Sequence, residues 1–357
     1  MKKKVLVIGL SSILGGVETY IFNLVKNSNK DLYDYFFLII GDKKSVFENE
    51  INKMFEGNKN RFYYCPNMKK NIFKGIKWIK DFYNENHFDY IYMNTCTCAK
   101  FLYCIPALKK GTKLISHSHS GDGDSKLNNG FFRLFVNKYS YKKFACSDLA
   151  GKWLYGKKCK DYTIVPNGVD TNRFEFNNEM RDKIRGDFKF ESNDIIIGHV
   201  GRFSEQKNQK FFIELANILP NNYKFLLIGD GPKKIQFQES VNANGLDNRF
   251  IILSNSNKIE HYYNAMDLFV MPSTYEGLPI VSVEAQTNGL ICVLSDSVSR
   301  NSDLSDHCYF IPLTDLDNWG EIIKNIDIKR YDGVKEIKKR HFDICSTVSI
   351  VEKELNK

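Results

Sequence analysis

The sequence predicts an α/β protein with two doubly wound, Rossmann-like domains that face a cleft. The chain has 357 residues, which is more than one ordinary hydrophobic core supports. Short apolar runs rich in Ile, Val, Phe and Leu alternate with helical patterns, as in parallel sheets that helices cover on both faces. This alternation starts again after residue 170, which indicates a second domain of the same type.

The apolar runs predict five strands in each half of the chain. In the first half they are Lys4–Gly9, Tyr35–Ile40, Tyr90–Met93, Lys113–Ser116 and Lys143–Cys146. In the second half they are Ile195–Val200, Lys224–Ile228, Phe250–Leu253, Leu268–Met271 and Ile291–Leu294. Ligands of such sheets bind at the carboxyl ends of the strands, so the loops that follow the strands are the expected places for a site.

A polar stretch from Pro166 to about Asn193 is the expected linker between the domains. The first domain should therefore span residues 1–170 and the second, ligand-binding domain residues 171–340. Residues 341–357 have the pattern of a helix, and we expect this helix to return toward the first domain.

The beginning of the chain resembles a signal peptide, because lysines precede the apolar run Val5–Leu14. No small-residue cleavage site follows, and Gly15-Gly16 leads directly into a helix, so a buried first strand is the better interpretation. The chain has no uncharged apolar run of about 18 residues, the length that would suggest a membrane span. Its nine cysteines form no C-x-x-C pair. We expect reduced, mostly buried thiols and a cytoplasmic location.

Charge is unevenly distributed along the chain. Residues 1–170 contain 28 lysines and arginines against 15 acidic residues, whereas residues 171–357 contain 23 against 27. A basic first half suggests an anionic partner, which could be nucleic acid, a membrane surface or a phosphorylated acceptor. No aromatic-basic recognition motif is present, which argues against nucleic acid.

A basic loop follows the first strand of the second domain. It contains Arg202 and Lys207 and leads into a predicted helix over Gln209–Leu219. Arginine offers a planar fork of donors and lysine a point charge, and the amides at a helix N-terminus add further donors. This arrangement is suited to a diphosphate, although two solvated loop cations would give the same pattern.

The most specific motif is the stretch Pro272–Ala285, which follows the strand Leu268–Met271. Pro279 suits the first position of a helix, which places Glu276 in the loop and Glu284 about one and a half turns into the helix. Carboxylates accept hydrogen bonds from two hydroxyls and so can orient a sugar. Alternatively, Glu276 could be an acid that favours the helix dipole and Glu284 a surface glutamate. Amides available to a diphosphate at this helix start would be those near Leu278, Ile280 and Val281.

These motifs together resemble glycosyltransferase family 4, over nearly the whole chain. Glu276 and Glu284, with seven residues between them, match the family's paired glutamates. Gly201-Arg202 with Lys207 matches its diphosphate clamp. The remaining matches are Gly15-Gly16-Val17-Glu18, which corresponds to the N-terminal glycine loop, and Val165–Asp170, which corresponds to the start of the linker. Glu284-Ala285-Gln286 and Leu294-Ser295-Asp296 resemble the branch that builds capsular polysaccharides and exopolysaccharides.

The resemblance implies a GT-B fold and a retaining transfer of sugar from a nucleotide diphosphate donor, without a metal ion or other cofactor. Arg202 and Lys207 would stabilise the leaving diphosphate. Glu276 would hold the transferred sugar and Glu284 the ribose, and the Gly15-Gly16 backbone would approach the distal phosphate. Further donor contacts would come from the helix start, at Gly277, Leu278 and Ile280. Uridine is the expected base, and the first domain would bind the acceptor, a lipid-linked or other saccharide.

The sequence departs from the common family pattern at Asn288-Gly289-Leu290-Ile291, where a small residue and then a proline are more usual. This departure puts the local packing in question more than the chemistry.

Two motifs in the first domain bear on the chemistry. His117 and His119 alternate after the strand Lys113–Ser116. In similar enzymes a histidine lies beside the donor sugar, and His119 fits that position better than His117 does. Both could instead be polar residues satisfied within a loop. Asp122 and Asp124 form an Asp-x-Asp, which binds a manganese-diphosphate pair in the other main glycosyltransferase fold, but this pair lies in a glycine-rich loop without that sheet order.

A basic amphipathic stretch at Lys69–Tyr83 has an apolar stripe of Ile72, Ile76, Ile79 and Tyr83. Such a helix can lie on the anionic inner face of a membrane, or it can be an ordinary helix whose stripe packs on the sheet. Phe131–Phe135 is a second aromatic-basic stretch, which could line an acceptor groove or belong to the core.

Two other classes of protein compete with a glycosyltransferase. A nicotinamide-dependent oxidoreductase would need G-x-G-x-x-G after the first strand, and Gly9 to Gly16 lacks that spacing, although Asp42 could be the acid that such a site requires. A non-catalytic partner of a polysaccharide assembly complex could keep the fold and bind saccharide only. The presence of Arg202 and Lys207 together with both glutamates argues against that alternative.

Overall fold

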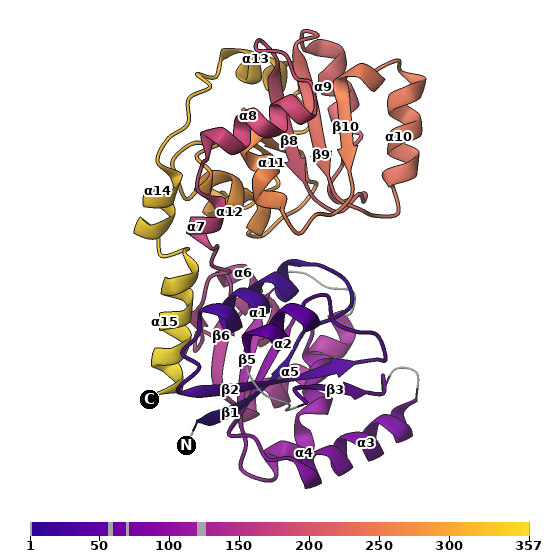
Figure 1. The fold of residues 1–357 in the computed structure, drawn as a ribbon. Coiled ribbons are helices and arrows are strands. Elements are labelled where there is room, and N and C mark those ends of the chain that lie inside the picture. Colours follow the sequence, from indigo (N-terminus) through magenta and orange to yellow (C-terminus); the bar gives the residue numbers. More distant parts are fainter. Residues whose placement is uncertain (1, 56–59, 69–70, 120–125, 357) are drawn as a thin grey trace. The chain divides into compact units, whose positions relative to one another are not determined.

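The computed structural model describes residues 2–55, 60–68, 71–119 and 126–356. The chain forms two compact units, one of residues 1–168 and 344–357, the other of residues 169–343. Each unit is a parallel sheet with helices on both faces, and they are described separately (Figure 1).

The sheet of the first unit has seven parallel strands in the order β3-β2-β1-β4-β5-β6-β7. Their bounds are β1 Lys3–Ile8, β2 Tyr33–Ile40, β3 Phe62–Cys65, β4 Tyr90–Thr95, β5 Lys113–Ser118, β6 Ser140–Ala145 and β7 Thr163–Ile164. The order reverses between β1 and β4, which pair through residues such as Val5 and Tyr90. A doubly wound sheet binds ligands beyond the carboxyl ends of the strands at this reversal.

Helices cover both faces of this sheet. They are α1 Gly16–Asn27, α2 Glu48–Met54, α3 Ile72–Glu85, η1 Cys98–Tyr103, α4 Ile105–Leu108, α5 Lys126–Tyr139, α6 Asp148–Tyr155 and α15 Ile344–Leu355. One face packs against α1, α2 and α15. The other face packs against α3, η1, α4, α5 and α6. The final helix α15 thus belongs to the core of the first unit, where it contacts α1.

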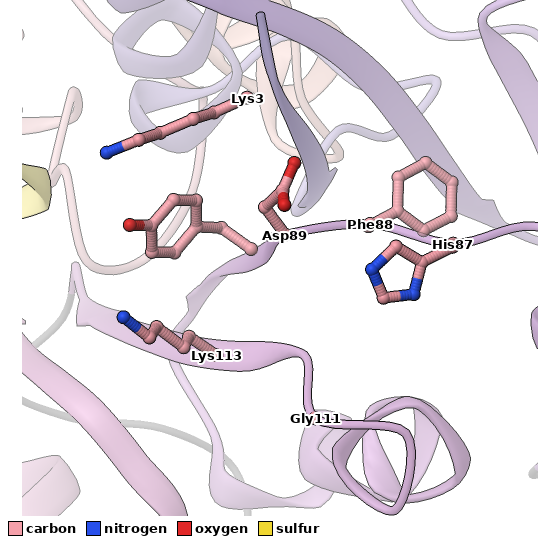
Figure 2. A pocket seen from close by; sticks show the side chains of 7 residues that line it. Lys3, His87, Phe88, Asp89, Gly111 and Lys113 are labelled. Atoms are coloured by element: carbon pink, nitrogen blue, oxygen red, sulfur yellow. The ribbon is translucent and has the colours of Figure 1, made fainter. Parts of the chain in front are cut away.

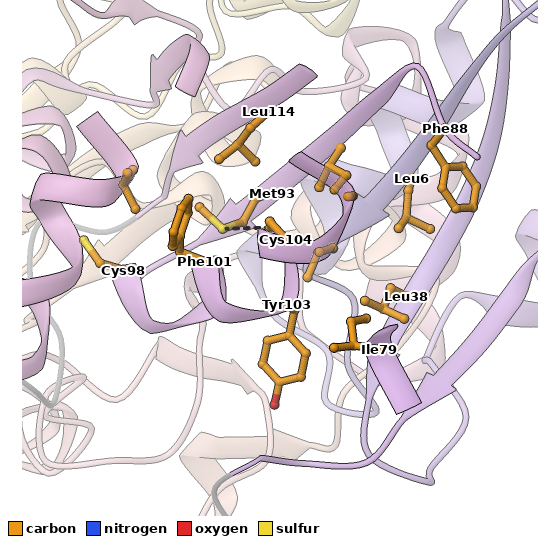
Figure 3. Packing of buried hydrophobic residues seen from close by; sticks show 14 of the residues in the cluster. Leu6, Leu38, Ile79, Phe88, Met93, Cys98, Phe101, Tyr103, Cys104 and Leu114 are labelled. Carbon is orange, nitrogen blue, oxygen red and sulfur yellow. Dashed lines mark hydrogen bonds between the residues drawn. The ribbon is translucent and has the colours of Figure 1, made fainter. Parts of the chain in front are cut away.

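Buried sulfur and aromatic groups fill the second of these layers. Figure 3 shows Met93 and Cys104 beside Phe101 and Leu114, and the Cys104 Sγ lies 3.9 Å from the Met93 Sδ. Both side chains are buried. All nine cysteines are free thiols, and burial raises the pKa of the Cys65 thiol to about 12. The buried thiols act as small hydrophobic side chains.

The sheet of the second unit has six parallel strands in the order β10-β9-β8-β11-β12-β13. Their bounds are β8 Ile195–Val200, β9 Tyr223–Ile228, β10 Phe250–Leu253, β11 Leu268–Met271, β12 Ile291–Ser295 and β13 Cys308–Ile311. The order reverses between β8 and β11, so the loops after these two strands meet at the same edge of the sheet.

The helices of the second unit also form two layers. They are α7 Thr171–Phe174, α8 Asn178–Asp187, α9 Phe211–Ile218, α10 Lys234–Ala243, η2 Asp247–Arg249, α11 Ile259–Ala265, α12 Ile280–Thr287, η3 Arg300–Ser302, α13 Leu316–Asn325 and α14 Gly333–Lys339. One face of the sheet packs against α9, α10 and α13, and the other against α7, α8, α11, α12 and α14.

The expected linker over Pro166–Asn193 was too long. Most of this stretch is ordered structure of the second unit, because it forms α7 and α8, and Phe174 and Ile184 are buried in the core there. Side-chain caps explain why so polar a stretch is helical: Asp170 accepts from the Arg173 amide, and Asn177 accepts from the Met180 amide.

All ten expected strands are present, and three more were missed. The missed strands are β3, β7 and β13. Each lies at an edge of its sheet and has four residues or fewer. Short edge strands give little alternation from which to predict them.

Candidate active site

The loop after β8 is held against the loop after β9 through backbone hydrogen bonds. The Gly201 amide donates to the Ile228 carbonyl over 3.0 Å, and the Phe203 amide donates to the Asp230 carbonyl over 3.1 Å. A Cβ on Gly229 would lie 2.0 Å from the Gly201 carbonyl oxygen. Glycine is therefore required there, and its absent side chain lets the two loops pack closely.

Lys207 and Glu276 form an ion pair at the carboxyl edge of the second sheet. The Lys207 Nζ lies 2.7 Å from the Glu276 Oε1, and both side chains are largely buried. The Gln206 amide nitrogen also donates to the Glu276 Oε1 over 3.1 Å, and to the Tyr275 carbonyl over 2.9 Å. The Thr274 amide donates to the Gln206 carbonyl over 2.8 Å. The loops after β8 and β11 therefore form one surface.

Arg202 lies in the same loop but points to solvent. Its side chain is exposed, and it makes no hydrogen bond or ion pair with any residue that the structure describes. Its backbone, by contrast, is fixed, because the buried Gln209 side chain donates to the Arg202 carbonyl over 3.0 Å. Because its backbone is fixed and its guanidinium is exposed, Arg202 is suited to binding an anionic ligand.

The paired glutamates occupy different environments. Helix α12 begins at Ile280, and Pro279 is its N-cap, so the prediction that Pro279 is the first helical residue was wrong by one position. Glu276 lies in the preceding loop, where its carbonyl accepts from the Ser299 amide over 3.0 Å. The Ser302 hydroxyl donates to the Gly277 carbonyl in the same loop. The α12 N-terminus has no side-chain cap, which leaves its first amides available to a ligand.

Glu284 is buried rather than a surface residue. Its side chain lies within α12 and only 6% of the residue is exposed. The Tyr263 hydroxyl donates to its Oε2 over 2.9 Å. Burial raises the pKa of Glu284 to about 7, against the opposing effects of the Tyr263 hydrogen bond and the Arg173 charge.

The departure at Asn288-Gly289 is accommodated by specific contacts. The buried Asn288 amide nitrogen donates to the Phe174 carbonyl over 2.9 Å and to the Asn264 Oδ1 over 3.2 Å. Gly289 has a φ of +77°, and a Cβ there would lie 2.3 Å from the Tyr331 carbonyl oxygen. These contacts fix the end of α12 and thereby the helix that carries Glu284.

In the first unit, Gly15 and Gly16 form the start of α1. Gly15 is the N-cap, and its carbonyl accepts from the Thr19 amide over 3.0 Å. A Cβ on Gly15 would lie 2.9 Å from the Glu18 Oε2, whereas a Cβ on Gly16 would meet nothing within 4 Å. The Glu18 carboxylate is held by the Ser11 hydroxyl over 2.7 Å. The glycine loop is therefore open on one side at the carboxyl edge of β1.

His119 is held by two asparagines that the sequence did not single out for this role. Its Nε2 lies 2.8 Å from the Asn94 Oδ1, and its Nδ1 lies 3.0 Å from the Asn167 Oδ1. Burial lowers the pKa of His119 to about 3, so the ring is neutral. A neutral imidazole has a single N–H, so it can donate to only one of these two amide oxygens, and the other ring nitrogen remains an acceptor.

His117 is a core residue next to His119. Its Nδ1 lies 2.8 Å from the Tyr92 hydroxyl, which lies 2.7 Å from the Tyr20 hydroxyl. Its Nε2 has no hydrogen-bond partner among the residues described, and burial lowers its pKa well below the usual value. The interpretation of His117 as a polar residue satisfied in a loop is therefore wrong, because the residue belongs to β5 and one of its ring nitrogens is buried without a partner among the described residues.

The Asp122-x-Asp124 motif lies outside the described residues. Within the described ranges, no group of three or more His, Cys, Asp or Glu side chains could hold a metal ion. Among those same residues, no helix is both long enough and apolar enough to cross a bilayer.

A small hollow at the opposite edge of the first sheet has a structural role. Figure 2 shows the residues that line it, which are Lys3, His87, Phe88, Asp89, Tyr90, Gly111 and Lys113. Lys3, Tyr90 and Lys113 each begin a strand, so the hollow lies at the amino ends of the strands. The Tyr90 hydroxyl donates to the Leu355 carbonyl over 3.1 Å, and Lys3 reaches the same carbonyl over 3.4 Å. These contacts hold the end of α15.

Two parallel sheets, each covered by helices on both faces, are the architecture of the GT-B fold. Solved structures agree. The structure described as Anabaena Alr3699/HepE in complex with UDP and glucose has a TM-score of 0.82 at 19% identity, covering 99% of both chains. The apo form of the lipopolysaccharide outer core galactosyltransferase WaaB has a TM-score of 0.71 at 16% identity, covering 99% of both chains.

Sequence comparisons give the family. Residues 14–173 match Glycosyltransferase Family 4, and residues 180–326 match the family described as Glycosyl transferases group 1. The chain therefore belongs to glycosyltransferase family 4 and is a glycosyltransferase.

The named relatives are glycosyltransferases, and one of them is named for capsular polysaccharide biosynthesis. EpsF of Bacillus subtilis (strain 168) is 28% identical over 303 residues, which are 81% of this chain and 78% of the relative. The capsular polysaccharide biosynthesis glycosyltransferase CapH of Staphylococcus aureus is 28% identical over 62% of each chain. The Escherichia coli UDP-Gal:alpha-D-GlcNAc-diphosphoundecaprenol alpha-1,3-galactosyltransferase is 31% identical over 44% of this chain and 43% of its own.

Proposed function

We propose that the protein transfers a sugar from a nucleotide diphosphate sugar, a UDP-sugar, to a saccharide acceptor, with retention of configuration and without a metal ion. One observation carries this proposal. The Lys207–Glu276 ion pair joins the loops after β8 and β11 at the sheet edge where the strand order reverses. Arg202 lies in the loop after β8, and its guanidinium makes no hydrogen bond or ion pair with the described residues. A cationic surface with an adjacent carboxylate can bind a diphosphate and the sugar that it carries.

In this proposal the cationic residues bind the diphosphate and the carboxylates bind hydroxyl groups of the donor. Arg202 and Lys207 stabilise the negative charge that grows on the leaving diphosphate, and the open N-terminus of α12 adds amides. Glu276 accepts hydrogen bonds from hydroxyls of the transferred sugar, and Glu284 from hydroxyls of the ribose. The Gly15-Gly16 backbone approaches the distal phosphate.

We infer the transfer step from the family resemblance, and we assign no protein nucleophile to it. The bond between the anomeric carbon and the diphosphate oxygen breaks. The acceptor oxygen bonds to the anomeric carbon on the same face, and the acceptor proton passes to the leaving phosphate. His119, which lies beside Asn94 and Asn167, orients the donor sugar through the ring nitrogen that does not donate to an asparagine.

We further propose a lipid-linked acceptor and a role in the synthesis of capsular polysaccharide, exopolysaccharide or O-antigen. The names of the CapH and galactosyltransferase relatives support this assignment. A lipid-linked acceptor places the enzyme at the inner face of the cell membrane, with the rest of the protein in the cytoplasm.

Exposed apolar side chains in the first unit support this membrane contact. Phe73 is 83% exposed near the start of α3, and Phe131 is 63% exposed on α5. Both helices follow the carboxyl ends of strands, β3 and β5. Of the stripe on α3, Ile79 and Tyr83 are buried, whereas Ile72 and Ile76 are exposed. The helix therefore packs on the sheet through one end of its stripe and presents the other end to solvent, beside lysines that suit an anionic surface.

A turnover assay tests the proposal. Purified wild type would be incubated in EDTA with a panel of nucleotide sugars and with membrane extract as a source of acceptor, and release of nucleoside diphosphate would be measured. We expect one UDP-sugar to be consumed, with the sugar recovered in the lipid fraction. Binding of saccharide without turnover of any donor would instead favour the non-catalytic partner, and turnover only with Mn²⁺ would favour the Asp122-x-Asp124 motif.

A further inference from the structure

Tyr263 contacts Glu284 from a helix that the sequence motifs do not include. It lies on α11, and its ring is fully buried. Its hydroxyl lies 2.9 Å from the Glu284 Oε2 and 3.2 Å from the Val281 carbonyl oxygen. A phenol has one proton to donate, and a carboxylate is the stronger acceptor of the two, so the hydrogen bond to Glu284 dominates.

Packing fixes the direction of this hydroxyl. The Tyr263 ring meets the Phe174 ring edge-on at 5.7 Å between centroids, and it lies 6.0 Å from the Phe269 ring. All three aromatic side chains are buried. A ring held on two sides cannot swing away from Glu284 when a ligand arrives, so the contact is preorganised.

Few other groups act on the Glu284 carboxylate. Arg173 on α7 and Glu260 on α11 influence it through charge only, and they are paired with each other, with the Arg173 Nε 2.9 Å from the Glu260 Oε2. Among the described residues, only Tyr263 donates a hydrogen bond to this carboxylate, and it does so to Oε2, whereas Oε1 accepts none. One oxygen is thus held while the other stays available to ligand hydroxyls.

We infer that Tyr263 is a positioning residue, which orients the Glu284 carboxylate so that its second oxygen receives the ribose hydroxyls of the donor. This inference rests on the proposed function, because it takes Glu284 to be the ribose ligand. It adds a residue to the donor site and predicts that the residue acts entirely through Glu284.

The test compares Tyr263→Phe with Tyr262→Phe, which makes the same change one residue earlier on α11. Binding would be measured by calorimetry, with the nucleotide sugar that wild type binds most tightly among UDP-glucose, UDP-galactose, UDP-N-acetylglucosamine and GDP-mannose. We expect Tyr263→Phe to weaken binding about tenfold at pH 8, where the wild-type Glu284 carboxylate is mostly ionised, the size expected for loss of a hydrogen bond to a charged group. Tyr262→Phe should bind as wild type does. Phenylalanine keeps the ring contacts, and thermal unfolding would verify the fold.

The pH profile separates positioning from a merely structural effect. The diphosphate of a nucleotide sugar stays ionised across pH 6 to 9, so a change in affinity there reports on the protein. Glu284 binds hydroxyls best when ionised, and its pKa is raised to about 7, so wild-type affinity should rise between about pH 6 and pH 8. Loss of the Tyr263 hydroxyl raises this pKa further, which should move the rise to higher pH. Glu284→Gln should abolish the rise.

A double variant completes the test. In a Glu284→Gln background, Tyr263→Phe should change affinity less than twofold, because the group through which it acts is gone. An equal loss in both backgrounds, or a Tyr263→Phe profile identical to that of wild type, would overturn the positioning role while leaving the donor site intact. Failure of wild type to bind any of the four nucleotide sugars would overturn the proposed function together with this inference.

Discussion

Lys207 and Glu276 depend on each other because each is the other's counter-ion in a largely buried setting. Removal of either leaves an unpaired charge and, in the proposed function, takes away a group assigned to the reacting sugar or the diphosphate. We predict that Lys207→Ala and Glu276→Ala each lower kcat by about 100- to 1,000-fold, the loss typical for an electrostatic contact to a transition state. Turnover of the donor would be measured, with circular dichroism to verify folding.

Lys210→Ala provides the matched control. Lys210 is an exposed lysine three residues after Lys207. Lys210→Ala removes one positive charge, as Lys207→Ala does, but leaves the Lys207–Glu276 ion pair intact. It should keep the wild-type rate. Near-normal turnover by Lys207→Ala or Glu276→Ala would contradict the assignment of these residues.

At the level of single residues, the motifs predicted the charged groups but not what holds them. Arg202, Lys207 and the two glutamates have a recognisable spacing, and the structure places the Lys207 and Glu276 side chains together. Their supports could not be predicted, because Gln206 and Tyr263 have no distinguishing pattern. A tyrosine in a short helix indicates core packing, and its hydroxyl finds Glu284 only after α11 and α12 pack together.

At the level of elements, internal strands were predictable and edge strands were not. A central strand such as β8 is apolar on both faces and stands out from its neighbours. Strands β7 and β13 have partly exposed residues and few of them. Likewise, the polar composition of α8 suggested a linker, whereas its single buried isoleucine, Ile184, and its asparagine cap are enough for a surface helix.

Two glycines of the second unit test local constraints on its helices: Gly289 follows the end of α12, and Gly186 lies within α8. Gly289 follows α12 with a φ of +77°, and a Cβ would lie 2.3 Å from the Tyr331 carbonyl oxygen. Gly289→Ala should therefore destabilise the second unit by about 2 kcal/mol or more. Gly186 lies within α8, and a Cβ there meets nothing within 4 Å, so Gly186→Ala should stabilise the helix by about 0.5–1 kcal/mol.

Calorimetric melting of both variants measures these effects. The transition of the second unit should fall by about 4–8 °C for Gly289→Ala and rise by about 1–4 °C for Gly186→Ala. A Gly289→Ala transition at or above that of wild type would show that the end of α12 is not under the steric constraint described.

At the level of the whole molecule, the alternation of apolar strands with helices occurs twice along the chain. Each occurrence has enough apolar residues for its own core, so the sequence predicted two sheets. The first unit also includes residues 344–357, since α15 buries Ile344, Val348, Val351 and Leu355 there. The cleft between the domains stays a prediction, and so does the contact of the basic half with a membrane.

Vesicle binding tests the membrane contact. We predict that wild type binds vesicles containing phosphatidylglycerol at low salt, does not bind phosphatidylcholine vesicles, and is released as salt screens the attraction. Phe73→Ser combined with Phe131→Ser should weaken this binding, because both side chains are exposed on the first unit. Ile235→Ser is the control, because Ile235 is 75% exposed on the second unit. If wild type does not bind the anionic vesicles at low salt, the proposed membrane contact is contradicted.

The central claim is that the second unit binds a nucleotide sugar through its cationic loop without a metal ion. Calorimetric titration of nucleotide sugars in EDTA, with wild type and Arg202→Ala, tests it most directly. We predict that wild type binds one nucleotide sugar in EDTA and that Arg202→Ala weakens binding by about tenfold or more. The melting temperature should be unchanged, because this exposed side chain makes no hydrogen bond or ion pair with the described residues. Absence of binding in EDTA, or binding that Arg202→Ala leaves intact, would contradict the account.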